Sequence, residues 1–137
     1  MERTFGLTTI TKHSMAIAFS PDRMPPHEYL DQYASFMLLR RHMKSAMSDQ
    51  AFGGVMTEHI AAQYPKMQIP FVIVNGASDY NVPAAWAKQA EQILPNAKAI
   101  IVPDTGHELM FNKPDEILRA MDLAWEMADE MNRKENL

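Results

Sequence analysis

The sequence predicts an α/β protein in which short parallel strands alternate with helices, preceded by a mainly helical segment. Two continuous apolar runs, "PFVIV" from Pro70 and "AKAIIV" from Ala97, have the composition of strands covered on both faces. A turn and a helix-type pattern follow each run, which is the order of a βαβ unit with a parallel sheet. The 137 residues suffice for one domain with a hydrophobic core.

Composition is that of a globular protein and excludes several functions. Apolar residues make up 47% of the chain, and a net charge of −4 gives no attraction for a nucleic-acid backbone. The basic cluster Arg40 to Lys44 is expected to be a solvated helix face. The absence of cysteine excludes thiol nucleophiles, disulfides and thiolate metal sites. No stretch has the roughly 20 apolar residues of a membrane span, and the first residues lack a secretory pattern. We therefore expect a cytoplasmic protein that binds neither nucleic acid nor membrane.

Residues 1–66 are expected to be mainly helical. The stretch from Pro25 to Met47 opens with two prolines suited to a first helical turn. Its apolar residues then recur at spacings of three, four or seven, which predicts one amphipathic helix. Gly53-Gly54 is expected to end that helix, and residues 55–64 to form a shorter one. Residues 8–20 remain open between strand and helix, because their β-branched residues favour a strand while "SMAIAF" suits either.

Residues 67–137 carry the strand, helix, strand, helix pattern. Helices are predicted from Pro83 to Leu94 and from Lys113 to Met131, after the first and second apolar runs respectively. Trp86 and Trp125 are most simply core residues of these two helices. The charged residues after the last helix are expected to fray.

The turns at the two strand ends carry the candidate chemistry. Asp79 follows the first apolar run, and His107 follows the second after room for one crossover helix. The carboxyl ends of parallel strands share one edge of the sheet, so the carboxylate is expected to reach the imidazole. A carboxylate on Nδ1–H orients the ring and leaves Nε2 free to take a proton from a nucleophile. Either residue alone is more simply a turn residue, whereas the pair at matching strand ends favours a catalytic role.

The stretch from Met67 to about Ala128 resembles the C-terminal part of an α/β-hydrolase. The family's "G-x-x-D-x-x-V-P" turn after its next-to-last strand matches Gly76, Asp79, Val82 and Pro83. Its "G-H" turn after the last strand matches Gly106-His107, and the proline that starts its final helix matches Pro114. Asn112 is a small departure, because an acid is common there. The helical residues 25–64 resemble the cap that the family inserts over its active site.

The resemblance implies a partial α/β-hydrolase fold in which residues 1–66 are cap-like and residues 67–137 are the hydrolase portion. It also implies that Asp79 is the orienting acid and His107 the general base. A group of cap residues is expected to line a pocket for an apolar acyl or aryl group, although helix packing explains the same stripe. These candidate substrate-binding residues are Tyr29, Tyr33, Phe36, Met37 and Met43. No cofactor and no metal are expected, because the histidines lack ligand spacing and no glycine-rich phosphate loop is present.

The nucleophile of that family is missing from this sequence. The family places a serine on a "G-x-S-x-G" elbow before the acid and the histidine, and no serine here has glycines at that spacing. Ser78 lies on the acid turn and lacks the elbow. The resemblance thus implies part of a serine hydrolase of small ester, amide or related substrates, inactive by itself. The alternative is a non-catalytic fragment or interaction module whose Asp/His pair is a remnant.

The expected sheet of two strands would have open edges, and a two-stranded sheet is marginal alone. We therefore expect the chain to pair with a missing N-terminal half or to associate with itself through that edge.

Overall fold

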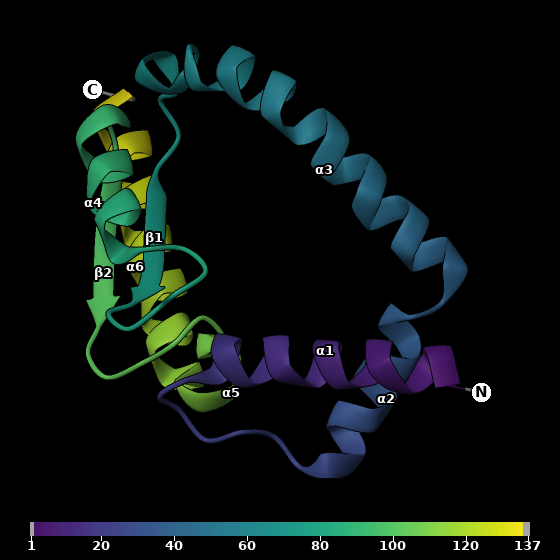
Figure 1. The fold of residues 1–137 in the computed structure, drawn as a ribbon. Coiled ribbons are helices and arrows are strands. Elements are labelled where there is room, and N and C mark those ends of the chain that lie inside the picture. Colours follow the sequence, from purple (N-terminus) through teal and green to yellow (C-terminus); the bar gives the residue numbers. More distant parts are fainter. Residues whose placement is uncertain (1, 136–137) are drawn as a thin grey trace.

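The structure, a computed structural model, describes the backbone of residues 2–135 and the side chains of residues 9–53 and 57–134. Helices come first along the chain (Figure 1): α1 (Glu2–Phe19), α2 (His27–Met37), α3 (Arg40–Ala61) and the short 3-10 helix η1 (Tyr64–Lys66). Strands and helices then alternate: β1 (Phe71–Gly76), α4 (Ala84–Ile93), β2 (Ala97–Val102), α5 (Leu109–Asn112) and α6 (Pro114–Glu135).

The sheet consists of β1 and β2, which pair in parallel with Phe71 opposite Ala97 and Gly76 opposite Val102. Helix α4 packs on one face of the sheet, and α6 packs on the other face against β1 (Figure 1). The predicted α/β class with parallel strands and flanking helices is confirmed. Most strand residues are only half-buried, because a single helix covers each face. The strands are therefore less enclosed than their continuous apolar runs predict.

Helix α1 occupies the stretch that the sequence left open between strand and helix. Met15, Ala18 and Phe19 are buried on it, at the spacing of three and four that places residues on one helical face. Met15 and Phe19 pack with Leu30 of α2 into a hydrophobic cluster, against which Tyr29 also packs. The tertiary contacts of this face outweigh the local β-preference of the branched residues nearby.

Two predicted helix boundaries in residues 25–64 are wrong. The single helix expected up to residue 47 is broken at Leu39, whose extended backbone (φ −62°, ψ 130°) separates α2 from α3. The break expected at Gly53-Gly54 does not occur, since α3 continues through both glycines. Each glycine costs a helix only about 1 kcal/mol relative to alanine, which a helix of 22 residues tolerates. The tail after residue 131, expected to fray, is helical as far as Glu135, and residues 136–137 lie outside the described part.

Several large apolar side chains are exposed, against expectation. Trp86 on α4 is 60% exposed and Trp125 on α6 is 72% exposed, so neither is a core residue. Leu118 and Met121 precede Trp125 at helical spacing and are also largely exposed, which makes an apolar stripe on the outer face of α6. Periodicity predicted which residues share a face, but it does not reveal whether another element covers that face.

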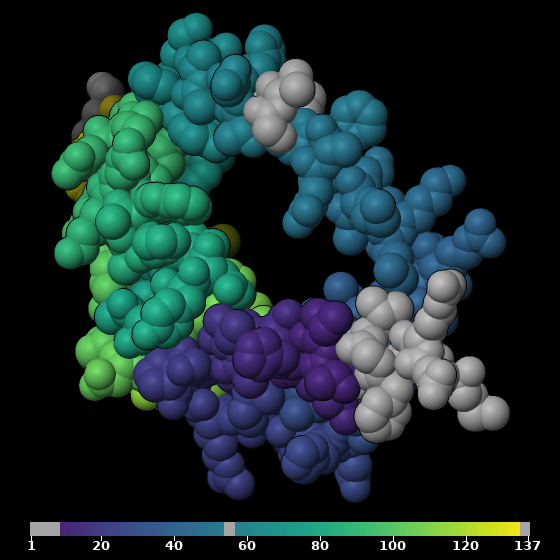
Figure 2. All heavy atoms as spheres, in the orientation of Figure 1, coloured from purple at the N-terminus to yellow at the C-terminus, as the bar shows by residue number. Residues whose placement is uncertain are grey.

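Helix α3 stands apart from the sheet and joins α2 to η1 (Figure 1). Figure 2 shows open space between α3 and the elements opposite it, and its Met47 and Phe52 are largely exposed. The predicted division into residues 1–66 and 67–137 falls between η1 and β1 and stays a prediction. Among residues 2–135, no helix is both long enough and apolar enough to cross a membrane.

Candidate active site

The turns after β1 and β2 lie on the same rim of the sheet, because the two strands are parallel and end in register. The acid turn carries Asp79 and the histidine turn carries His107. The backbone N–H of Ser78 donates to the carbonyl oxygen of Thr105 at 3.0 Å, which ties the two turns together. Thr105 is fully buried, so this link is shielded from water.

The side chains of Asp79 and His107 are hydrogen-bonded, as the positions of the two turns predicted. The distance from Asp79 Oδ2 to His107 Nδ1 is 2.9 Å. The Asp79 side chain is 3% exposed, whereas that of His107 is 38% exposed. With Nδ1–H donating to the enclosed carboxylate, the imidazole holds a fixed orientation and Nε2 is left to accept a proton. The role of the pair in catalysis stays a prediction.

Backbone donors hold the Asp79 carboxylate in its turn. The N–H groups of Asn81 and Val82 both donate to Oδ1 at 2.8 Å. Burial is the largest influence on the pKa of Asp79 and acts to raise it, but the hydrogen bonds from Val82, His107 and Asn81 outweigh burial. The pKa of Asp79 therefore lies below its ordinary value, and the group is ionised at neutral pH.

Replacing Asp79 with asparagine should lower stability at neutral pH by about 1–3 kcal/mol and by less in acid. The folded-state pKa of Asp79 lies below the ordinary value of 3.8. The ionised Asp79 carboxylate therefore stabilises the folded chain fully at pH values above the ordinary pKa. This stabilisation is lost as the pH falls through the folded-state pKa of Asp79. Urea unfolding of both proteins at about pH 7 and about pH 2.5 measures the difference.

The matched control for that experiment is Asp104→Asn, in the exposed part of the histidine turn. Asparagine tolerates the positive φ of 50° found at Asp104, so this variant should match the parent at both pH values. A destabilisation by Asp79→Asn that is the same at both pH values would contradict the argument.

Asn75 is a positioning residue that the sequence reasoning missed. It is buried at the end of β1, and its Nδ2 donates to Asp79 Oδ2 at 3.2 Å and to the Val82 carbonyl oxygen at 3.1 Å. It thereby links the beginning and the end of the acid turn. The sequence feature that could have indicated this role is an amide side chain at the end of an apolar run, four residues before Asp79.

Asn75→Ala is expected to cost about 1–3 kcal/mol of unfolding free energy, because it removes the donor to a carboxylate and to a carbonyl in a buried turn. Asn96→Ala is the matched control, since it removes a hydrogen bond to the Gln68 carbonyl oxygen in an exposed place. That variant should cost less than about 1 kcal/mol. Urea unfolding measures both, and equal losses would argue against a special role for Asn75.

The last turn of α1 and the loop after it hold the histidine turn. The His107 N–H donates to the Ala18 carbonyl oxygen at 2.8 Å, and the Gly106 N–H donates to Asp22 Oδ2 at 2.7 Å. A Cβ at position 106 would lie 2.3 Å from the Ser20 carbonyl oxygen. The φ of Gly106 is not positive, so the backbone conformation of the turn does not require a glycine there. Close approach of two backbones is what requires it.

A cavity of about 480 Å³ opens beside His107. Of the predicted cap residues, Tyr33, Met37 and Met43 line it, together with apolar side chains of α1. Burial, followed by the negative charge of Glu108, raises the pKa of Tyr33. The Tyr33 phenol therefore keeps its proton at neutral pH and can donate a hydrogen bond.

Tyr29 and Phe36 do not line this cavity, and their assignment to substrate binding stays a prediction. The Tyr29 ring packs 5.4 Å from the Phe111 ring, on the side of α2 that faces the core cluster. The Phe36 ring lies 3.9 Å from the His42 ring and is half exposed. The break at Leu39 turns the chain, so the stripe expected on one long helix is divided between α2 and α3.

Among the residues that the structure describes, no group of three or more His, Asp or Glu side chains could hold a metal ion.

Parallel strands whose carboxyl ends present a hydrogen-bonded acid and histidine, in that chain order, define the C-terminal part of an α/β-hydrolase. A family model described as TAP-like protein matches residues 50–121, more than half of the chain, including both strands and both turns. The chain therefore belongs to the TAP-like family of α/β-hydrolases. No curated protein and no solved structure matches it.

Proposed function

We propose that this chain supplies the general base and the orienting acid of a serine-type hydrolase that acts on small ester, amide or related substrates. The observation that carries the proposal is the 2.9 Å hydrogen bond between Asp79 Oδ2 and His107 Nδ1. The Asp79 carboxylate is enclosed, whereas the His107 imidazole borders a cavity. An imidazole held in this way can move protons to and from a neighbouring hydroxyl group.

The proposed reaction has two halves, in both of which His107 moves a proton. In the first, Nε2 takes the proton of the serine hydroxyl as the serine oxygen bonds to the substrate carbonyl carbon. It then gives that proton to the leaving alcohol or amine as the old bond breaks. In the second, Nε2 takes a proton from water as the water oxygen attacks the acyl carbon. It gives that proton to the serine oxygen as the acyl–serine bond breaks and the carboxylic acid product leaves. Asp79 stabilises the imidazolium in both halves.

The serine is proposed to come from a segment that carries a strand, an elbow and a helix and that pairs with the free edge of β1. Among the described residues, β2 is the only strand that pairs with β1. Helix α6 packs against β1, and its outer stripe around Trp125 is exposed. A docked segment of this kind would cover apolar surface and give β1 a second neighbour, both of which favour association.

The cavity beside His107 favours neutral substrates with an apolar acyl or aryl group. Met37 and Met43 provide adaptable apolar walls, and the Tyr33 hydroxyl is a hydrogen-bond donor. Glu108 also lines the cavity, and among the side chains that the structure describes no lysine or arginine does so. A carboxylate-bearing substrate would therefore meet a like charge without a compensating cation.

One observation favours the alternative function, a non-catalytic interaction module in which Asp79 and His107 are remnants. No serine of this sequence lies on a "G-x-S-x-G" elbow.

Mixing this chain with a nucleophile-bearing segment of a TAP-like hydrolase tests both functions. We expect a complex of the two chains, hydrolysis of a nitrophenyl ester by the complex only, and labelling of the added segment by a serine-reactive fluorophosphonate. Labelling of the 137-residue chain itself would contradict the proposed division of roles. Self-association of this chain, with no complex and no gain in hydrolysis, would support the interaction module.

A further inference from the structure

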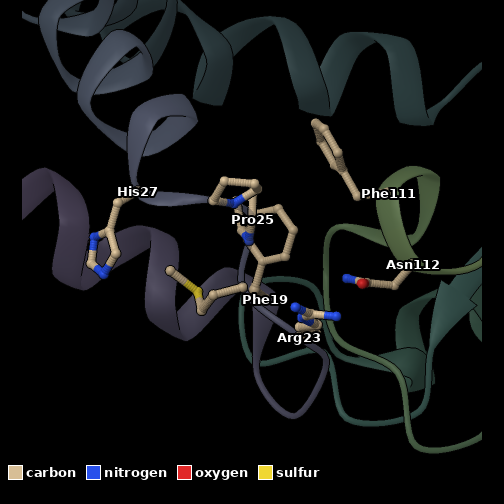
Figure 3. Close-up of a pocket in the computed structure, with 8 residues that line it drawn as sticks. Phe19, Arg23, Pro25, His27, Phe111 and Asn112 are labelled. Atoms are coloured by element: carbon tan, nitrogen blue, oxygen red, sulfur yellow. The ribbon is translucent and has the colours of Figure 1, made fainter.

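A second cavity, of about 600 Å³, lies between the loop after α1, the start of α2 and the short helix α5 (Figure 3). It shares no lining residue with the cavity beside His107. Neither the sequence motifs nor the proposed hydrolysis gives it a role.

One part of this cavity is an apolar wall of rings. The Phe19 and Phe111 rings have centroids 5.4 Å apart at an angle of 51°, and Pro25 continues the wall from the loop. Phe19 is almost fully buried, so its position is set by the core and does not depend on a ligand. Rigid ring walls of this kind hold a flat or apolar group with little loss of side-chain freedom.

The polar part of the cavity includes two side chains that can donate hydrogen bonds, Asn112 and Arg23. The Asn112 Nδ2 is buried and has no hydrogen-bond partner among the described residues. Figure 3 shows this amide pointing into the cavity that the Arg23 guanidinium also lines. Arg23 forms none of the ion pairs found in the described part of the chain, and no Asp or Glu lines the cavity. A buried donor without a partner destabilises the folded chain, and an acceptor on a ligand would remove that penalty.

We propose that this cavity binds a small organic carboxylate that carries an apolar or aromatic group. The guanidinium of Arg23 donates to a carboxylate in a planar, two-pronged geometry, and the Asn112 amide can donate to one of the same oxygens. The Phe111 ring, which is 45% exposed and is backed by the buried Phe19 ring, then packs against the apolar group of the ligand. This site is independent of the proposed hydrolysis, since none of these residues lies in the catalytic cavity.

Titration of the 137-residue chain with phenylacetate and with phenylacetamide tests the proposal. The two compounds have the same ring and the same length, and only the first is charged. Phenylacetate is expected to bind at least about tenfold more tightly and to shift the NMR signal of the Asn112 side-chain amide. Arg23→Gln, a substitution at an exposed position, should weaken phenylacetate binding by about tenfold or more, and Asn112→Ala by less.

Arg40→Gln is the matched control, because Arg40 is exposed on α3 and lies outside this cavity, so it should leave phenylacetate binding unchanged. Equal affinity for the acid and the amide would overturn the proposal. So would phenylacetate binding that Arg23→Gln leaves intact, or binding whose NMR shifts are confined to residues of the His107 cavity. No measurement here involves hydrolysis, so these outcomes are distinct from failure of the proposed function.

Discussion

Replacing His107 with alanine should abolish ester hydrolysis by a complex of this chain with a nucleophile-bearing segment, with a fall in kcat of about 10⁴-fold or more. In the proposed mechanism, loss of the imidazole removes the base that takes the proton of the attacking serine and, later, that of the attacking water. Steady-state hydrolysis of a nitrophenyl ester by purified complexes measures the loss. The fall should be in kcat rather than in KM, because the proposed role of His107 is to act on the reacting atoms.

His59→Ala is the matched control, since His59 is exposed on α3 and remote from the turns, and it should leave kcat unchanged. A second test uses the coupling between the two proposed catalytic residues. Asp79→Asn should also lower kcat steeply, yet the double variant with His107→Ala should fall no further than His107→Ala alone. A His107→Ala complex that keeps most of the activity, or losses that simply multiply, would show that the pair does not act as one unit.

Gly76→Ala is expected to destabilise the chain by about 3 kcal/mol or more, enough to unfold much of it. A Cβ at position 76 would lie 2.2 Å from the carbonyl oxygens of both Gly106 and Thr105. These atoms belong to backbone in a buried turn, so no flexible side chain can move aside. Relief of the clash requires the histidine turn to separate from the acid turn, which would also break the contact between Asp79 and His107.

Gly53→Ala is the matched control, because nothing lies within 4 Å of a Cβ at that position. Gly53 is inside α3, where alanine should stabilise the helix by about 0.5–1 kcal/mol. Urea unfolding followed by circular dichroism compares both variants with the parent. If Gly76→Ala were as stable as the parent, the close approach of the two turns would not be a feature of the folded chain.

The parts of the fold that could be predicted from the sequence depend on short-range properties. The strands around Ile73 and Ile100 follow from the length and continuity of their apolar runs, and both lie where the sequence predicts. The contact between Asp79 and His107 follows from a general rule, since turns after parallel strands meet on one rim.

The parts that could not be predicted depend on which elements meet. Leu39 is neither a glycine nor a proline, so no local signal marks the break between α2 and α3. The packing of α2 against α1 also has no local signal, because it joins two separate elements. Trp125 belongs to a regular apolar stripe, yet no element of the described chain covers that stripe. No local sequence pattern indicates the role of Asp22, because Asp22 and the Gly106 N–H that it accepts from are 84 residues apart in the sequence.

By itself, the sequence determined the two strands, the helices that follow them and the acid and histidine at the strand ends. Each of these depends on the order of neighbouring residues. The tertiary structure alone decided that Asn75 and the loop after α1 hold the two turns, and that Trp86 and Trp125 remain exposed. It also decided that Tyr33, but not Tyr29, borders the cavity at His107. These outcomes depend on free energies of contact between residues far apart in the chain, and no local pattern of residues encodes such contacts.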